Sequence, residues 1–176
     1  MGRDLLQSRY LDTRDVAAGR VGFFPSRDLT AGSRQKADQA IRLVRSAFRQ
    51  EFRCLVKAMT SGVVIECQEA TERAILDVCI GVEQRLERLQ KELLTAKMVE
   101  EILSITATEL RRWSKSGRIP TGGRAYFSQG KKQVGLFLYQ PEVILDLAAR
   151  PDQISEWRNR DREVASSGKP PAAPAP

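Results

Sequence analysis

Positive charge gathers in one short part of the chain. The protein has a net charge of +7, and residues 94–150, with nine basic and five acidic side chains, account for +4 of it. Within that segment Arg111, Arg112 and Lys115 lie close enough to share the exposed side of a helix, beside the small Ala107. Such cations meet phosphates and guanine edges in the major groove of DNA, and a small residue lets a helix approach closely. This pattern predicts a polyanionic partner, with duplex DNA the expected one.

The residues around these cations predict two short helices joined by a turn. Thr95 is placed to cap the first helix, and a three-residue turn then leads to Thr106. Thr106 and Glu109 have the spacing of a capping box, in which each side chain binds an open backbone donor of the other residue. Gly117 is suited to end the second helix in a left-handed conformation. We expect Trp113 to be buried between the two helices, as in a helix-turn-helix.

The chain after the second helix has the period of a β-hairpin. Apolar and polar residues alternate over 124–127 and again over 134–139, and the loop between them carries Lys131 and Lys132. A proline at the start of 141–150 predicts a third helix. The hairpin with its basic tip would form a wing beside the helix-turn-helix.

This order of features resembles the MerR/excisionase-type winged helix-turn-helix. The resemblance rests on the Leu-Thr start and turn of 94–106, the Arg-Trp pair and Lys-Ser-Gly-Arg-Ile-Pro exit within 110–120, and the helix start at 139–145. The resemblance and the outward-facing cations together imply a DNA-contacting set of Thr106, Thr108, Arg111, Arg112, Lys115, Arg124, Lys131 and Lys132. Ala107 departs from the family, whose members often have a polar reader there. The longer wing loop is more similar to that of phage small terminase subunits.

Two amphipathic stretches precede this segment. Apolar residues recur every three or four positions between Ala37 and Met59, and again over 63–93. The expected fold is therefore mainly α, with an N-terminal helical hairpin or one long bent helix over 33–93, followed by the winged helix-turn-helix. Neither apolar stripe can cover the other along its whole length, so we expect a homo-oligomer, a dimer, formed through 33–93.

The two ends of the chain are expected to contribute little. Residues 1–32 show no period and predict a poorly ordered arm, while 151–176 predict a polar helix remnant and a Pro/Ala-rich disordered tail. The N-terminus has no apolar signal-peptide region, and no apolar run approaches the roughly 18 residues of a membrane span. A soluble, cytoplasmic protein is expected.

The sequence lacks the usual patterns of catalysis and metal binding. It contains no histidine, and its three cysteines have no C-x-x-C spacing. All three fall on apolar positions of the expected helices, which favours small buried side chains over metal ligands or structural disulfides. The glycines near Lys131 lack the spacing and the Ser or Thr of a phosphate-binding loop. We expect no enzyme activity, cofactor, metal or small-molecule effector.

These observations predict a non-catalytic, sequence-selective double-stranded DNA-binding protein. Its task would be transcription regulation, an accessory role in recombination and excision, or recognition of DNA for phage packaging, because all three use the same binding chemistry. The alternative is a protein-interaction adaptor, in which the helical hairpin binds a partner and the winged helix is a scaffold.

Overall fold

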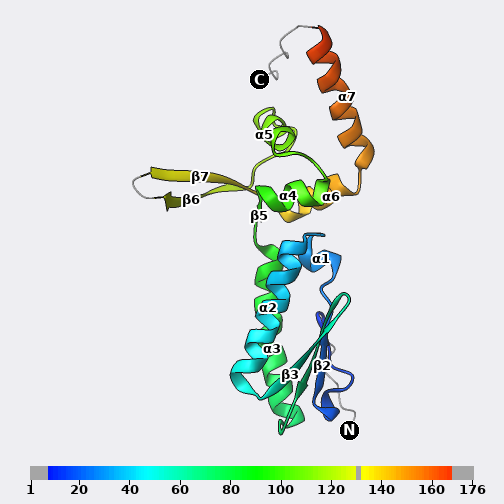
Figure 1. Ribbon diagram of the computed structural model, residues 1–176, viewed down its shortest axis with the longest axis vertical. Coiled ribbons are helices and arrows are strands. Elements are labelled where there is room, and N and C mark those ends of the chain that lie inside the picture. Colours follow the sequence, from blue (N-terminus) through cyan, green and yellow to red (C-terminus); the bar gives the residue numbers. More distant parts are fainter. Residues whose placement is uncertain (1–7, 130–131, 168–176) are drawn as a thin grey trace. The chain divides into compact units, whose positions relative to one another are not determined.

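The computed structural model describes residues 8–129 and 132–167 and divides into two compact units, Met1–Glu92 and Leu93–Pro176 (Figure 1). Each unit has its own antiparallel sheet and its own helices. The chain is therefore mixed α/β, and the expectation of a mainly α fold does not hold. In the part that the structure describes, no helix combines the length and apolar character needed to cross a membrane.

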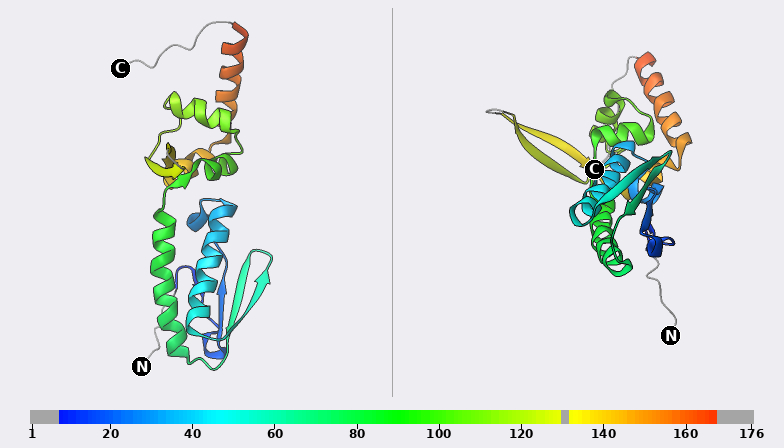
Figure 2. Two further views of the ribbon diagram at one scale, coloured as in Figure 1. Left: turned by 60° about the vertical axis from the view of Figure 1, so that its left-hand side comes forward. Right: turned by 60° about the horizontal axis from the view of Figure 1, so that its bottom comes forward.

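The first unit is a four-stranded antiparallel sheet with helices on one face. The strands lie in the order β1 (Leu11–Asp12), β2 (Arg20–Phe23), β4 (Gly62–Cys67) and β3 (Cys54–Met59). The helices are the 3-10 helix η1 (Val16–Ala18), α1 (Arg27–Thr30), α2 (Arg34–Glu51) and α3 (Glu72–Lys91). Figure 2 shows α2 and α3 side by side along the same face of the sheet.

Amphipathic patterning positions these elements. Ser33 caps α2 as expected, since its hydroxyl accepts the backbone N–H of Lys36 at 3.3 Å. Helix and strand side chains then bury each other in one core, which includes Val21, Phe23, Val44, Phe48, Val63, Ile65, Ile75, Val82 and Leu86. Removing this apolar surface from water is the main stabilising contribution to the unit.

The helices expected over 33–93 are shorter than the apolar spacing indicates, because a β-hairpin lies between them. α2 ends at Glu51 rather than near Met59, and α3 begins only at Glu72. The residues between them form β3 and β4, joined by a turn at Thr60–Ser61. The prediction of a helical hairpin or one bent helix is wrong here.

A period of two explains the hairpin. On β4 the alternate residues Val63, Ile65 and Cys67 are buried, and β-branched side chains favour such a strand. Leu55 and Met59, which the helical interpretation placed on the buried stripe, are 51% and 52% exposed on the edge strand β3. A short apolar run fits both the helical period of about 3.6 residues and the strand period of two. The packing of the sheet decides between them.

The arm predicted over 1–32 is also wrong for its described residues. β1, η1, β2 and α1 all lie within it, and they bury Leu11, Val16, Val21, Phe23 and Leu29 in the core. The apolar residues lack a period because they belong to several short elements rather than to one helix or strand. Residues 1–7 lie outside the described part.

The sheet also removes the reason for expecting a dimer. α2 and α3 bury their apolar stripes against the sheet of the same unit, so no second copy is needed to cover them. The homo-oligomer expected through 33–93 has no support from the packing of these helices.

The second unit combines helices with a three-stranded sheet. It begins with β5 (Leu94–Thr95), α4 (Ala96–Leu103) and α5 (Ala107–Lys115). The hairpin β6 (Gly123–Gln129) and β7 (Lys132–Tyr139) follows, and then α6 (Pro141–Ala148) and α7 (Pro151–Ser167). The strand order is β5-β7-β6, and Figure 1 shows the hairpin extending away from the helices of this unit.

The core of this unit contains both tryptophans of the chain. Trp113 is fully buried, as the sequence predicts, and its ring meets Trp157 of α7 edge to face at a centroid distance of 5.2 Å. For residues 151–176 the sequence predicts only a polar helix remnant and a tail. Instead α7 runs through Ser167 and contributes Ile154 and Trp157 to the buried set. Residues 168–176, expected to be disordered, lie outside the described part.

Candidate nucleic-acid interface

Local capping holds α5 in place. The hydroxyl of Thr106 accepts the backbone N–H of Glu109 at 3.2 Å, and Glu109 Oε2 accepts the backbone N–H of Thr106 at 2.8 Å. This is the predicted capping box. At the other end Gly117 has a φ of +74°, the left-handed conformation that glycine adopts readily. The helix is thus defined at both ends by its own sequence.

The exposed side of α5 carries a small residue between polar and basic ones. Ala107, Thr108, Arg111 and Lys115 are exposed and, with Arg112, line a shallow recess of about 450 Å³. Their exposure agrees with the expectation that these residues lie on the outward side of the second helix. Because Ala107 projects so little, another surface could approach the helix axis closely there.

A groove lies between α5 and the hairpin β6–β7. It has a volume of about 600 Å³, and three cations, Arg111, Lys115 and Arg124, are among its lining residues. Among the described residues that line it, Glu100 of α4 is the single carboxylate. Among the residues that the structure describes, Arg111 and Lys115 form no ion pair within 4.0 Å. An anion at this groove could therefore approach Arg111 and Lys115 without displacing a carboxylate from an ion pair.

The hairpin side of the groove combines the cation Arg124 with apolar side chains. Leu136 and Phe137 are each 42% exposed, and the guanidinium carbon of Arg124 lies 4.8 Å from the centroid of the Phe137 ring. This cation–π contact holds the Arg124 side chain along the hairpin. Tyr126, on the same hairpin, is 63% exposed. The groove therefore offers positive charge beside flat or branched apolar side chains.

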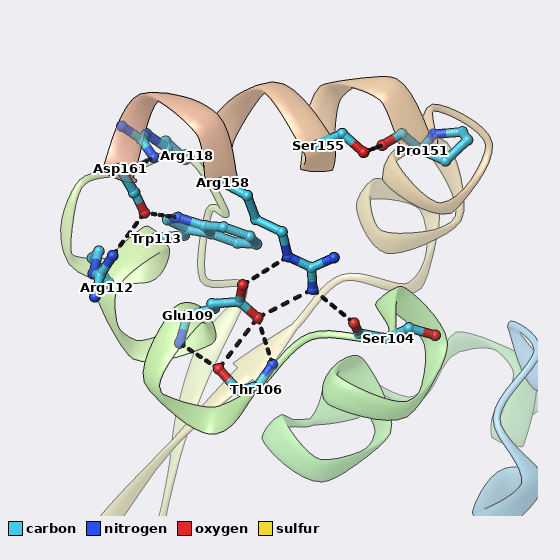
Figure 3. A network of polar contacts seen from close by, with 10 residues as sticks. All are labelled: Ser104, Thr106, Glu109, Arg112, Trp113, Arg118, Pro151, Ser155, Arg158 and Asp161. Carbon is cyan, nitrogen blue, oxygen red and sulfur yellow. Dashed lines mark hydrogen bonds and ion pairs between the residues drawn. The ribbon is translucent and has the colours of Figure 1, made fainter. Parts of the chain in front are cut away.

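A polar network ties α7 to the opposite flank of α5 (Figure 3). Asp161 accepts three hydrogen bonds: from Trp113 Nε1 at 2.9 Å, from Arg118 at 2.8 Å and from Arg112 at 3.0 Å. Burial alone would raise the pKa of Asp161, but the hydrogen bonds from Trp113, Arg118 and Arg112 outweigh it and lower that pKa below its ordinary value. Asp161 therefore stays ionised and offsets one of the two positive charges that Arg112 and Arg118 bring to the network.

A second contact joins α7 to the capping box. Arg158 Nε donates to Glu109 Oε1 at 2.7 Å, and another nitrogen of the same guanidinium donates to the carbonyl of Ser104 at 2.9 Å (Figure 3). The hydrogen bond from Arg158, helped by those from Thr106, lowers the pKa of Glu109 to about 2. One carboxylate thus caps α5 and anchors α7, which fixes the position of the helix from two sides.

The polar network divides the site residues predicted from the sequence into two groups: those exposed at the groove and recess, and those whose side chains take part in the network. Thr108, Arg111, Lys115 and Arg124 remain exposed around the groove and recess. The hydroxyl of Thr106 is occupied by the capping box. Arg112 lies on the α7 side of α5, and its guanidinium is shared with Asp161.

The two wing lysines lie at the edge of what is described. Lys131 is outside the described residues, and of Lys132 the structure describes the backbone, which begins β7. Their predicted contact with DNA stays a prediction.

Sequence reasoning missed the part that α7 plays. Asp161, Arg158 and Arg118 were not among the candidate residues, although they determine where α5 and Arg112 lie. A signal was present: Ile154, Trp157 and Asp161 fall at the spacing of one helix face, which indicates that this helix packs on a neighbour. For the apolar residues of the hairpin, the sequence pattern indicates only β-strands and gives no sign that Tyr126, Leu136 and Phe137 are exposed.

The exposed side chains of the site are mainly hydrogen-bond donors and cations. Within 8–129 and 132–167, no cluster of three histidine, cysteine or carboxylate side chains could hold a metal ion. The exposed donors are guanidinium, ammonium and hydroxyl groups, which bind phosphate and base edges.

Comparisons with protein-family models, with curated proteins and with solved structures found no match to this chain.

Proposed function

We propose that the second unit is a winged helix-turn-helix domain that binds double-stranded DNA without catalysis. In this proposal α5 enters the major groove and the hairpin β6–β7 lies along the neighbouring backbone. The observation that carries the proposal is the exposed row Ala107, Arg111 and Lys115 on a short, doubly anchored helix, with Arg124 across the groove.

The charge distribution supports a nucleic acid over a small anion. The cations line an open groove and a shallow recess, not a closed pocket, and they extend from α5 to the hairpin. A polymer with regularly spaced phosphates can contact both places at once. Each phosphate neutralised releases counterions, which gives binding a strong dependence on salt.

The network on α7 supports different roles for the two adjacent arginines. Arg111 has no carboxylate partner among the described residues, so its guanidinium is available for a base edge. Arg112 is held by Asp161, which restrains its side chain and, because it is shared with Arg118, offsets part of its charge. We assign Arg111 to base reading and Arg112 to positioning α5.

The adaptor alternative is weakened in its original form, because α2 and α3 bury their apolar faces in their own unit. One observation still favours a protein partner: Tyr126, Leu136 and Phe137 are exposed on the hairpin. Exposed apolar groups of this kind occur at protein interfaces. In that case the hairpin, not the helices of the first unit, would be the docking element.

The test is fluorescence anisotropy of the full chain with labelled duplex DNA of random sequence over a series of salt concentrations. Duplexes selected from a random library by the wild-type protein serve as the specific arm. We expect Lys115→Ala to weaken binding to all duplexes and to lower the slope of log affinity against log salt by about 0.9. Arg111→Ala should cost about 1–3 kcal/mol on selected duplexes and much less on random DNA.

Arg160→Ala is the matched control, because it removes one exposed cation of α7 that lines neither the groove nor the recess. It should leave both affinity and salt slope near the wild-type values. The proposal is overturned if Arg111→Ala and Lys115→Ala behave like Arg160→Ala. The same outcome, together with capture of a protein partner that Phe137→Ser abolishes, would establish the adaptor alternative.

A further inference from the structure

Two cysteines of the first unit face each other across neighbouring strands. Cys54 is the first residue of β3 and Cys67 is the last residue of β4, and they are direct partners in the register of the sheet. Their sulfur atoms lie 3.2 Å apart. The sequence alone indicated separate positions on two helices, so this pairing follows only from the hairpin.

The hydrogen bonds on either side define the geometry of the pair. The backbone N–H of Cys67 donates away from β3, to the carbonyl of Gly19 at 2.8 Å, while that of Gln68 donates to Arg53 on the β3 side at 3.0 Å. Cys54 and Cys67 are therefore a non-hydrogen-bonded pair. Cα atoms in such a pair are about 4.5 Å apart, within the range of about 4.4–6.8 Å that a disulfide spans. A bond between the two sulfurs requires no rearrangement of the strands.

The two thiols differ in access. Cys54 is partly exposed, whereas Cys67 is 9% exposed, and burial together with the hydrogen bond to Cys54 raises the pKa of Cys67 to about 12. An external reagent thus reaches Cys54 first, and Cys67 serves as the internal partner. Cys79 is buried on α3, and burial raises its pKa to about 12 as well.

We propose that Cys54 and Cys67 form a reversible redox dithiol, oxidised to a cross-strand disulfide by small disulfides of the glutathione class. The Cys54 thiolate attacks one sulfur of the reagent, its S–S bond breaks, and one glutathione thiolate leaves. Cys67 then gives its proton to water and attacks Cys54 Sγ, which releases the second glutathione. Two protein thiols are oxidised, and one disulfide is reduced to two thiols.

The position of the pair gives the bond a structural effect. β3 is an edge strand, paired on one side only with β4. The turn at Thr60–Ser61 already closes one end of the hairpin, and the disulfide closes the other. Oxidation therefore holds the edge strand against the sheet from both ends, and this inference is independent of the proposed binding to DNA.

The test is thiol counting on the native full chain. The native protein is incubated with oxidised glutathione, and the reagent is removed. The chain is then unfolded in guanidinium with an alkylating reagent, so that every remaining thiol is counted, before digestion and mass spectrometry. We expect loss of two of the three alkylatable thiols, a protein mass lower by two hydrogen atoms, and a peptide linkage between Cys54 and Cys67. Dithiothreitol should restore all three thiols.

Cys79→Ser is the matched control and should form the same linkage. Cys54→Ser should retain an unmodified Cys67, because the buried thiol is not reached directly. The guanidinium-unfolded chain, treated in the same way, shows that the reagent is active. The inference is overturned if the native chain keeps three free thiols while the unfolded chain is oxidised, if Cys79 enters the bond, or if oxidation stops at a stable glutathione adduct on Cys54.

Discussion

Replacing Asp161 with alanine removes the acceptor that holds α7 against α5. Three hydrogen-bond donors lose their acceptor, and the burial of each donor determines how much the free energy of unfolding falls. Trp113 is fully buried, so leaving its Nε1–H without an acceptor costs about 1–3 kcal/mol. The Arg118 side chain is 25% exposed and loses a charged hydrogen bond, worth about 1 kcal/mol at this exposure. Arg112 is 55% exposed, and water replaces most of its contact.

The sum is a loss of about 2–4 kcal/mol in the free energy of unfolding of the second unit. For a unit of this size such a loss lowers Tm by roughly 10 °C or more. The assay is urea and thermal unfolding followed by tryptophan fluorescence. Both tryptophans of the chain, Trp113 and Trp157, lie in this unit, so the signal reports its unfolding separately from that of the first unit.

Glu156→Ala is the control, since it removes an exposed carboxylate of the same helix that takes no part in the contacts of Asp161 and Arg158. It should change the stability by no more than about 0.5 kcal/mol. Equal stability of Asp161→Ala and Glu156→Ala would refute the reasoning that α7 is held through this carboxylate. A further readout is DNA affinity: release of Arg112 should alter binding by Asp161→Ala but not by Glu156→Ala.

Other outcomes follow from the same contacts. In the folded protein the pKa of Glu109 is about 2, below its ordinary value of 4.5. Ionised Glu109 therefore contributes its full stabilisation above pH 4.5, and this stabilisation is lost as the pH falls through about 2. Acid titration followed by tryptophan fluorescence should show the loss of stability, and the Glu109→Gln variant should lack this pH dependence. Gly62→Ala should destabilise the first unit by about 2 kcal/mol or more, measured by calorimetry, because an added Cβ would overlap the carbonyl oxygen of Phe23. Gly81→Ala, on an open helix surface, is its control and should be neutral or stabilising. Lys131→Ala should weaken binding to all duplexes alike and reduce the salt slope by about 0.9, measured by anisotropy.

The predictions that held depend on residues close together in the chain. The capping box of Thr106 and Glu109, the left-handed Gly117 and the buried Trp113 each involve one or two helical turns, so sequence spacing is enough to predict them. The proline at the start of α6 belongs to the same group. These features define α5 and therefore which of its residues are exposed.

The predictions that failed concern segments whose structure depends on distant partners. The apolar residues of 54–67 fit a helix and a hairpin almost equally well, and pairing of β4 with β2 selects the hairpin. The short elements within 8–32 have no period of their own and become ordered by adding strands and a helix to that sheet. Because packing of the sheet covers α2 and α3, the inferred need for a second copy also disappears.

The sequence by itself determined where α5 begins and ends, that it carries a basic exposed face, and that a hairpin follows it. Only the tertiary structure decided which of two adjacent arginines is available, because Asp161 lies 49 positions from Arg112 and meets it through the packing of Trp157 on Trp113. The same holds for Cys54 and Cys67, which share a register only once β3 and β4 pair. Local conformation follows from nearby residues, whereas the neighbours of a side chain follow from how the elements pack.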